Sequence, residues 1–260
     1  MRIITEAKIT LLSYPTFYAH PDYELPEHVF SAENLIAHAG KGCYDSYGRD
    51  GRSVAEHIAG LNAAKHYSVL EHANFSVFIE GISRGCSHEI VRHRHFSYSQ
   101  RSTRYTNEGD AAIVLDPYYA SIYNEMEEVS KAIKYDVDNV TYGRAERDLV
   151  RHFIISCETS IHEYEQQVNT LMALNPNKLE GRDLRKWARG KARQLLPHAL
   201  ETRMTMTGNI RCWNEFFYKR ISDDAEAEIR EMAIKTYSLL KPWAPTAFIR
   251  STDLPYTGEM

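Results

Sequence analysis

Residues 200–220, LETRMTMTGNIRCWNEFFYKR, carry two hydrophobic periods in direct succession. In Leu200–Thr207 the methionines alternate with polar side chains, which predicts a strand with one buried face. Gly208 and Asn209 are typical of a break, so we expect the strand to end before them. Ile210–Arg220 then predicts a helix. A strand that leads straight into a helix favours a fold that mixes both kinds of element.

The same signals recur along the rest of the chain. Further strands are expected at Lys8–Ser13, Phe75–Ile79 and Ala111–Leu115. Further helices are expected at Asn34–Ala39, Val54–Lys65, Ser83–Arg94, Tyr118–Tyr142, Arg144–Gln167, Gly181–Gln194 and Asp223–Leu240. The glycine-rich segment Gly40–Gly51 and the polar, aromatic segment His95–Asn107 are expected to be loops. The pattern predicts one α+β domain over residues 1–260, rich in helix, with a few strands in one sheet.

Composition excludes several classes of protein. The chain has 260 residues and a net charge of −4, so we expect no bulk binding to a nucleic-acid polymer or a membrane surface. The start, MRIITEAKITLLSY, lacks the pattern of a signal peptide. The four cysteines are scattered, which is typical of reduced thiols. We therefore expect a cytoplasmic protein, whether cellular or made by a virus.

The segment from Arg92 to Tyr105, RHRHFSYSQRSTRY, is the most basic and polar part of the chain. It holds four arginines, two histidines and four serine or threonine hydroxyls. Arginine forks and hydroxyls suit phosphate oxygens, and the aromatic rings suit a planar base. An anionic nucleotide is the partner that this segment predicts, and a solvated charged loop is the alternative.

The helix expected just before this segment adds to its charge. Ser83 is a candidate N-cap, and Cys86 and Ile90 are expected to face the core. Arg84, His88 and Arg92 recur every four residues and predict a basic stripe on one face. The alternative is a metal site formed by Cys86, His88, His93 and His95. The spacings of these residues match no ordinary zinc pattern, so no metal site is expected.

Four motifs resemble those of the flavin-dependent thymidylate synthases, the ThyX family. Arg92-His93-Arg94, followed after seven residues by Ser102, is similar to the family signature RHRx7S. The other three are HYSVLEH (His66 to His72), ARQLLP (Ala192 to Pro197), and the run from Glu201 through GNIR (Gly208 to Arg211) to Arg220. They occur in the family's order between about residue 5 and about residue 250. The resemblance implies a small, mostly antiparallel sheet flanked by several long helices.

The resemblance also implies which residues form the site. It assigns the flavin to His66, Ser68, Arg92, His93, Arg94, Gln100, Asn209, Ile210, Arg211 and Glu215. It assigns the nucleotide to Glu89, Arg92, Gln100, Arg101, Ser102, Thr103, Arg104, Arg193 and Arg220. We expect Arg220 to be catalytic, because a guanidinium stays charged and stabilises negative charge on the pyrimidine.

The reaction implied by the resemblance converts dUMP to dTMP. The cofactor is FAD, the carbon donor is methylenetetrahydrofolate, and NADPH is the reductant, in a homotetramer with shared active sites. Three acidic residues depart from the pattern that many members show: Glu89 in place of Gln, Glu215 in place of a neutral or basic residue, and Asp224 in place of His. These acids leave open dCMP as the substrate. A non-catalytic nucleotide-binding or RNA-binding protein is the alternative from another class.

Overall fold

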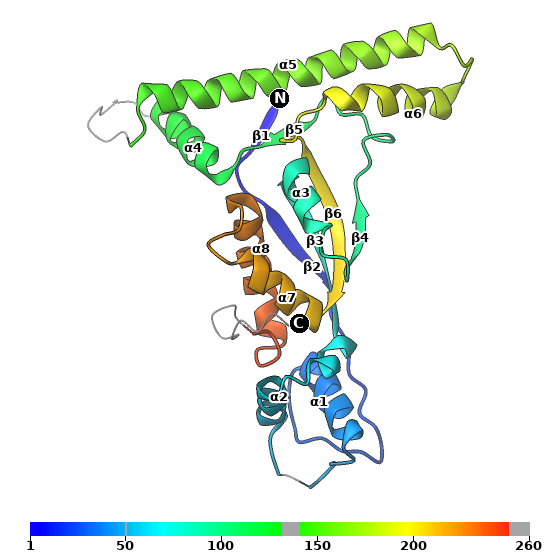
Figure 1. Cartoon of the computed structure of the whole chain (residues 1–260), viewed down its shortest axis with the longest axis vertical. Coiled ribbons are helices and arrows are strands. Elements are labelled where there is room, and N and C mark those ends of the chain that lie inside the picture. Colours follow the sequence, from blue (N-terminus) through cyan, green and yellow to red (C-terminus); the bar gives the residue numbers. More distant parts are fainter. Residues whose placement is uncertain (50, 132–140, 250–260) are drawn as a thin grey trace. The chain divides into compact units, whose positions relative to one another are not determined.

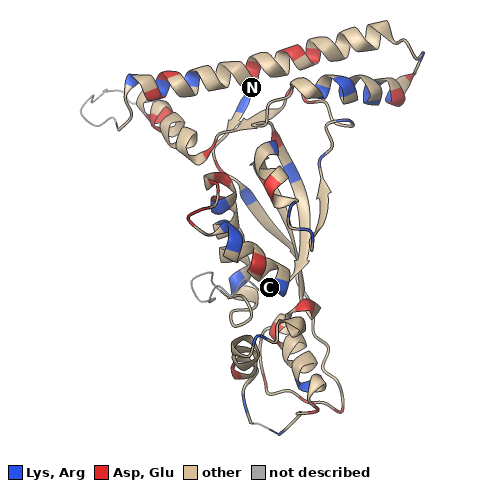
Figure 2. Cartoon of the chain, viewed as in Figure 1, with Lys and Arg blue, Asp and Glu red and all other residues tan. Residues whose placement is uncertain are grey.

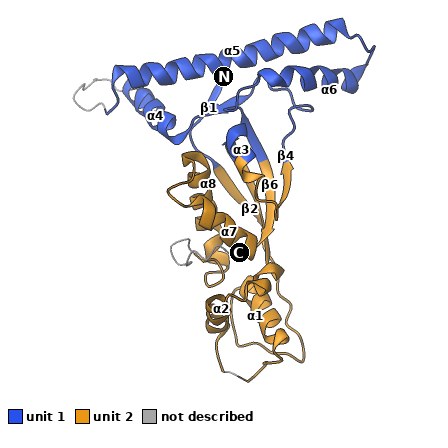
Figure 3. Cartoon of the chain, viewed as in Figure 1, with its two compact units in different colours: residues 1–7, 80–88, 100–203 blue, residues 8–79, 89–99, 204–260 orange. Residues whose placement is uncertain are grey.

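A computed structural model describes residues 1–49, 51–131 and 141–249. Within them the chain forms two compact units, each assembled from three separated stretches (Figure 3). Unit 1 consists of Met1–Ala7, Glu80–His88 and Gln100–Arg203, and unit 2 consists of Lys8–Ile79, Glu89–Ser99 and Met204–Met260. That the chain forms a single domain stays a prediction.

Unit 1 contains the longest helices of the described chain. Its elements are β1 (Arg2–Ile4), α3 (Arg84–Ile90, which ends in unit 2), β5 (Ala112–Val114), α4 (Pro117–Lys131), α5 (Arg144–Leu174), α6 (Gly181–Ala192) and the 3₁₀ turn η3 (Arg193–Leu195). Strands β1 and β5 pair in parallel, with Ile3 opposite Ile113. Helices α5 and α6 lie side by side, and Tyr164 and Val168 of α5 pack against Ala188 of α6 (Figure 1).

Unit 2 contains two helices from the N-terminal part of the chain and two from its C-terminal part. Its elements are β2 (Lys8–Ser13), α1 (Ser31–Cys43), α2 (Val54–Ala63), the 3₁₀ turn η1 (Tyr67–His72), α7 (Ile210–Arg220), α8 (Ala227–Leu240) and the turn η4 (Lys241–Trp243). Its aromatic core includes Phe75, Trp213 and Phe248, all fully buried. The buried carboxylate of Glu33 accepts hydrogen bonds from the backbone N–H groups of Thr246 and Ala247. Helix α1 thereby holds the last described segment of the chain.

The main sheet is small and antiparallel, with the strand order β2-β3-β6-β4. Besides β2, its strands are β3 (Asn74–Ser83), β6 (Glu201–Asn209) and β4 (Ser97–Gln100). Residues alternate between buried and half-buried along β3, as expected for a strand that covers a core on one face. The predicted α+β class, with a small sheet and long helices, is confirmed. The expectation of one sheet is wrong, because β5 pairs with β1 in a separate two-stranded sheet.

The helix predictions are confirmed in place and wrong mainly at their ends. Ile210–Arg220 is helical as predicted, and the Ser83 hydroxyl accepts the N–H of Cys86 as the expected cap. Helix α3, however, ends at Ile90 because the chain turns there, so Arg92 does not extend a helical stripe. The Tyr98 hydroxyl lies 2.8 Å from the freed carbonyl oxygen of Ile90 and donates to it.

The predicted ends of two further helices were wrong, because one glycine packs inside a helix and an asparagine, rather than an earlier residue, ends the other. Helix α1 continues to Cys43, through part of the expected loop, since Gly40 packs where a Cβ would lie 2.8 Å from Leu61. Helix α5 continues to Leu174, where Asn175 ends it in the left-handed conformation. The helix expected at Tyr118–Tyr142 is described only to Lys131, and residues 132–140 lie outside the described part.

The strand predictions missed two strands and misplaced the end of a third. Lys8–Ser13 is a strand as predicted, while β1 was missed and β4 lies within the expected loop. Strand β6 continues through Gly208 and Asn209, where we had expected a break. The reason is packing: a Cβ at Gly208 would lie 2.4 Å from the ring of Phe96.

Two observations concern membranes and thiols. No helix among the described residues combines the length and the apolar character that crossing a bilayer requires. None of the four cysteines, all of them in the described part of the chain, forms a disulfide. Cys86, Cys157 and Cys212 are buried, which confirms the expected core position of Cys86, and Cys43 is exposed.

The contact at Gly208 gives a stability prediction. We expect Gly208→Ala to lower the free energy of unfolding by about 1–3 kcal/mol, because the new methyl group displaces the buried Phe96 ring. Thermal and urea unfolding of both proteins measure the change.

Gly60→Ala is the matched control. Gly60 lies inside α2, and a Cβ there would meet only the Arg52 guanidinium at 3.5 Å. That substitution should leave stability equal or raise it by up to about 1 kcal/mol. Equal effects at both positions would contradict the packing role of Gly208.

Candidate functional site

Unit 2 joins Arg220, the last residue of α7, to two residues near the end of α3. The Arg220 Nη1–H donates to Oε2 of Glu89 at 2.8 Å, and its Nε–H donates to Nε2 of His93 at 3.0 Å. The backbone N–H of His93 bonds to the carbonyl of Ile90, so the turn after α3 presents the imidazole to Arg220. One guanidinium is therefore held by two partners.

This arrangement fixes the protonation of His93. Because Nε2 accepts a hydrogen bond from Arg220, the ring proton must lie on Nδ1. Burial, followed by the positive charges of Arg220 and Lys219, lowers the pKa of His93 from its usual 6.5 to about 4. The Phe216 ring packs edge-on, with centroids 4.9 Å apart. His93 is consequently a neutral acceptor at neutral pH.

A cavity of about 400 Å³ opens beside this group. Its lining residues are Arg92, His93, Arg94, His95, Phe96, Cys212, Glu215, Lys219 and Arg220. Glu215 accepts a hydrogen bond from Lys219 at 2.6 Å, so its charge is neutralised within the cavity wall. The structure thus brings five of the predicted site residues together: Arg92, His93, Arg94, Glu215 and Arg220.

A second cavity in unit 2, of about 350 Å³, contains three further predicted residues. His66, Ser68 and Arg211 line it together with Tyr44. The rings of Tyr44 and His66 stack with centroids 6.0 Å apart, and the Tyr44 hydroxyl lies 3.1 Å from Nδ1 of His66. Arg211 pairs with Glu71. The cavity therefore combines stacked rings with a guanidinium.

Asn209 and Ile210 serve the helix that follows them. The Asn209 side chain caps α7 by accepting the N–H of Cys212 at 3.0 Å. Ile210 is fully buried, and its N–H donates to the carbonyl of Ala73. Their assignment to the cofactor stays a prediction.

The predicted residues of unit 1 divide into buried and exposed ones. Gln100 donates through Nε2 to the hydroxyls of Ser87 at 2.8 Å and Thr202 at 3.2 Å. Arg101 is enclosed by two buried carboxylates: Nη2 donates to Glu108 at 2.8 Å and Nη1 to Glu201 at 2.9 Å. The Arg101 guanidinium is thus already occupied by the protein itself.

The remaining predicted residues of unit 1 include two exposed arginines. Thr103 is buried, Ser102 is half-buried, and Arg104 and Arg193 are exposed. Arg84, which the sequence did not single out as a ligand, donates to the carbonyl of Arg101 at 3.2 Å. Burial lowers the pKa of Arg84, the charge of Glu108 opposes this, and the charges of Arg193 and Arg101 add to the lowering.

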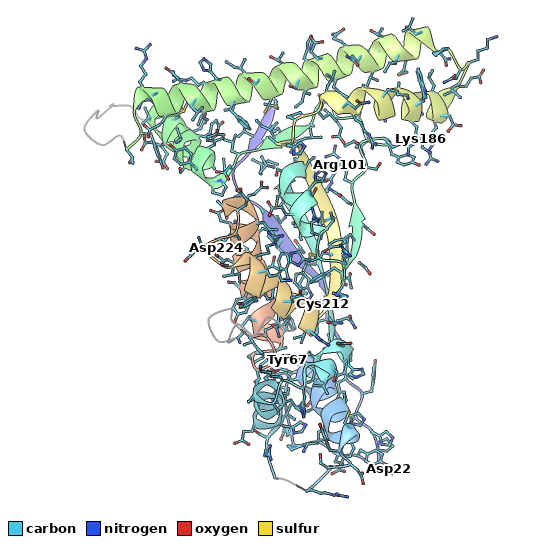
Figure 4. The ribbon with its side chains drawn as sticks, in the orientation of Figure 1. Asp22, Tyr67, Arg101, Lys186, Cys212 and Asp224 are labelled. Atoms are coloured by element: carbon cyan, nitrogen blue, oxygen red, sulfur yellow. The ribbon has the colours of Figure 1, made fainter. Side chains whose placement is uncertain are left out.

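Several lining residues could not be selected from the sequence. Tyr44 lies just after α1 in a glycine-rich stretch, and Cys212 and Lys219 follow the pattern of an ordinary helix. Asp224 is exposed and is not among the lining residues of either cavity (Figure 4). Among the described residues, no group of three His, Cys, Asp or Glu side chains is placed to hold a metal ion.

The enclosure of Arg101 gives a prediction that separates structure from binding. We expect Arg101→Gln to lower the free energy of unfolding by about 3–5 kcal/mol, because Glu108 and Glu201 are left buried without a cation. Arg104→Gln, which removes an exposed guanidinium three residues further along the same loop, should change it by less than about 0.5 kcal/mol. Chemical unfolding of the three proteins decides, and equal losses would contradict a structural role for Arg101.

A second prediction concerns pH. The folded chain keeps His93 neutral down to pH about 4, whereas the unfolded chain protonates it below about 6.5. The contribution of His93 to the free energy of unfolding should therefore decrease as the pH drops from 6.5 to 4, because the unfolded state binds the extra proton. Unfolding midpoints measured across this range should fall more steeply in the natural chain than in His93→Asn. Parallel curves would show that His93 is not held neutral.

Comparison with known protein families gives a match over most of the chain. The family described as "Thymidylate synthase complementing protein" matches residues 24–246. A flavin-dependent thymidylate synthase of Mycolicibacterium gilvum is 34% identical over 251 residues, which cover 95% of this chain and 91% of the relative. The enzyme of the same name from Mycobacterium marinum is 35% identical over 244 residues, which cover 93% and 88%.

Solved structures with a similar fold include a UMP/dUMP methylase, PolB, from Streptomyces cacaoi. Bound with 5-Br dUMP, it aligns with a TM-score of 0.68 and 17% identity over 95% of each chain. Bound with 5-Br UMP, it aligns with a TM-score of 0.65 and 15% identity over 95% of this chain and 94% of the other. At this identity the likeness concerns the fold.

Proposed function

Because this chain belongs to the flavin-dependent thymidylate synthase family, we propose that it methylates dUMP to dTMP, with methylenetetrahydrofolate as carbon donor and NADPH as reductant. The observation that carries the proposal is Arg220, fixed between Glu89 and His93 at the cationic cavity of unit 2. The remaining assignments follow from the chemistry of each group of residues.

Arg220 is the residue that we assign to the pyrimidine. Its positive charge stabilises negative charge that develops at N3 of the ring. Glu89 and His93 prevent the guanidinium from rotating, so its remaining N–H groups keep one direction. A pre-oriented cation costs little reorganisation when the ring is activated.

The donors of unit 2 fit FAD. Arg92, Arg94 and Arg211 offer charged donors for its diphosphate, and the cavity that contains Tyr44 and His66 offers ring faces for a planar group. We assign His66, Ser68, Arg92, His93, Arg94, Gln100, Asn209, Ile210, Arg211 and Glu215 to this cofactor. When bound, FAD supplies the transfer of reducing equivalents.

Unit 1 supplies donors that suit the nucleotide phosphate. The exposed guanidiniums of Arg104 and Arg193 and the hydroxyl of Ser102 are the groups that we assign to it. The other residues that we assign to the nucleotide are Glu89, Arg92, Gln100, Arg101, Thr103 and Arg220. Of these, Arg101 acts by holding the loop, because its donors bind Glu108 and Glu201. A homotetramer and a cytoplasmic location complete the proposal, and the four cysteines, none of which forms a disulfide, support the latter.

Of the three acids that raised dCMP as an alternative, Glu89 and Glu215 are paired with cations, and Asp224 is exposed and lines neither cavity. Glu89 pairs with Arg220 and Glu215 with Lys219, so neither presents a free carboxylate to an amino group. Their pairing favours dUMP. A protein that bound RNA without catalysis would have no use for a flavin site, so a bound flavin distinguishes that class.

The decisive assay supplies FAD, NADPH and methylenetetrahydrofolate with dUMP or dCMP in separate reactions. We expect the mass of dUMP to increase by one methylene unit, about 14 Da, and dCMP to remain unchanged. A product from dCMP alone would overturn the choice of substrate, and no product from either, with flavin bound, would overturn the proposed reaction.

The role of Arg220 gives a separate prediction. Arg220→Lys keeps the charge but loses the fork that contacts both Glu89 and His93. We expect kcat to fall about 100-fold or more, the loss typical of a missing transition-state donor, with FAD content unchanged. Arg230→Lys on α8, which changes an exposed ion pair, is the control and should keep full activity. Equal activity of the two variants would remove Arg220 from the mechanism.

A further inference from the structure

A second group of cations in unit 1 surrounds Tyr105, next to the segment assigned to the phosphate. Half of the Tyr105 surface is exposed (49%), and its ring lies 5.0 Å from Nζ of Lys186 and 5.3 Å from the guanidinium carbon of Arg182. Lys186 and Arg182 lie one turn apart on α6, where basic side chains gather (Figures 2 and 4). The opposite face of α6 is buried against α5.

The backbone of this loop is fixed to the same helix. Arg189 donates through Nη1 to the carbonyl of Tyr105 at 2.8 Å, while its buried Nε has no partner among the described residues. Arg104 lies alongside the helix at Gly190, where a Cβ would be 3.7 Å from its Nε. Four cationic side chains of unit 1 therefore converge on one short loop: Arg104, Arg182, Lys186 and Arg189.

These cations differ from the paired ones elsewhere in the chain. In the part of the chain that the structure describes, no carboxylate lies within ion-pair distance of Arg104, Arg182 or Lys186. The nearest buried acids, Glu108 and Glu201, are taken by Arg101. Lys186 beside the phenol, together with neighbouring positive charge, lowers the pKa of Tyr105. Like charges held together without a counter-charge repel one another, so this group favours an anionic partner.

We propose that Arg182 and Lys186, grouped around Tyr105, bind the polyanionic tail of a co-substrate. The required chemistry is several carboxylates or phosphates in a flexible chain, which would bind successive cations along α6. Two co-substrates of the proposed reaction can carry such a tail: the glutamate chain of the folate and the phosphates of NADPH. The inference rests on the proposed function for the identity of these molecules.

The experiment compares tails of different charge on the full-length protein. KM is measured for methylenetetrahydrofolate with one and with five γ-linked glutamates, and for NADPH and NADH, in the natural chain and in the double variant Arg182→Gln/Lys186→Gln. Loss of two charge-assisted contacts should raise KM about tenfold for the tail that binds there. The matching short-tailed molecule should change by less than about twofold, and high salt should reduce the difference.

The two arms identify the source of the tail. A selective rise for the pentaglutamate assigns the group to the folate, and a selective rise for NADPH over NADH assigns it to the phosphate. Direct titration with penta-γ-glutamate and with tripolyphosphate, followed by calorimetry, gives a readout independent of turnover. Arg185→Gln, which removes an exposed charge from the same helix without a contact to Tyr105, should behave like the natural chain in every measurement.

Two results would overturn the inference. One is an equal change in KM for long and short tails, and the other is a double variant that binds both probes as well as the natural chain does. Circular dichroism of the variant confirms that it is folded. Failure of the proposed function would appear separately, as a natural chain that does not convert dUMP although it binds the probes.

Discussion

The two carboxylates that enclose Arg101 determine how the rest of the basic segment is used. Glu108 and Glu201 are buried, so each needs a cation, and a single guanidinium serves both. The loop after β4 is thereby held to the start of β6 without a contribution from any ligand. Because Arg101 alone neutralises both buried carboxylates, the neighbouring cations of the loop remain available to bind other partners.

The arginines assigned to the nucleotide differ in how many carboxylate partners they have, and their roles differ accordingly. Arg101 has two and is structural, whereas Arg220 has one, Glu89, together with an imidazole acceptor that orients it. The exposed Arg104 and Arg193 have none among the described contacts. The same type of residue thus serves packing, orientation and recognition, according to where the acids lie.

The sequence predicted the class of the fold and most helices, because hydrophobic periodicity reports local burial. It could not predict that Gly208 continues a strand against Phe96, or that α3 ends at Ile90 beneath Tyr98, since both depend on contacts between segments. For the site, the motifs selected Arg92, His93, Arg94 and Arg220, which line one cavity, and the roles of these residues toward ligands stay predictions. The motifs could not reveal that Arg101 is enclosed, because one of its partners, Glu108, is near in the sequence and the other, Glu201, is far from it.

The uneven exposure of the thiols has a practical consequence. Cys43 is exposed and lies in the wall of the cavity that contains Tyr44 and His66, whereas the other three cysteines are buried. A thiol-reactive dye offered to the native chain therefore modifies one position, with no need to remove the other cysteines. Because that position borders the cavity, the rate of labelling becomes a direct gauge of whether the cavity is filled, and it can be read without any turnover.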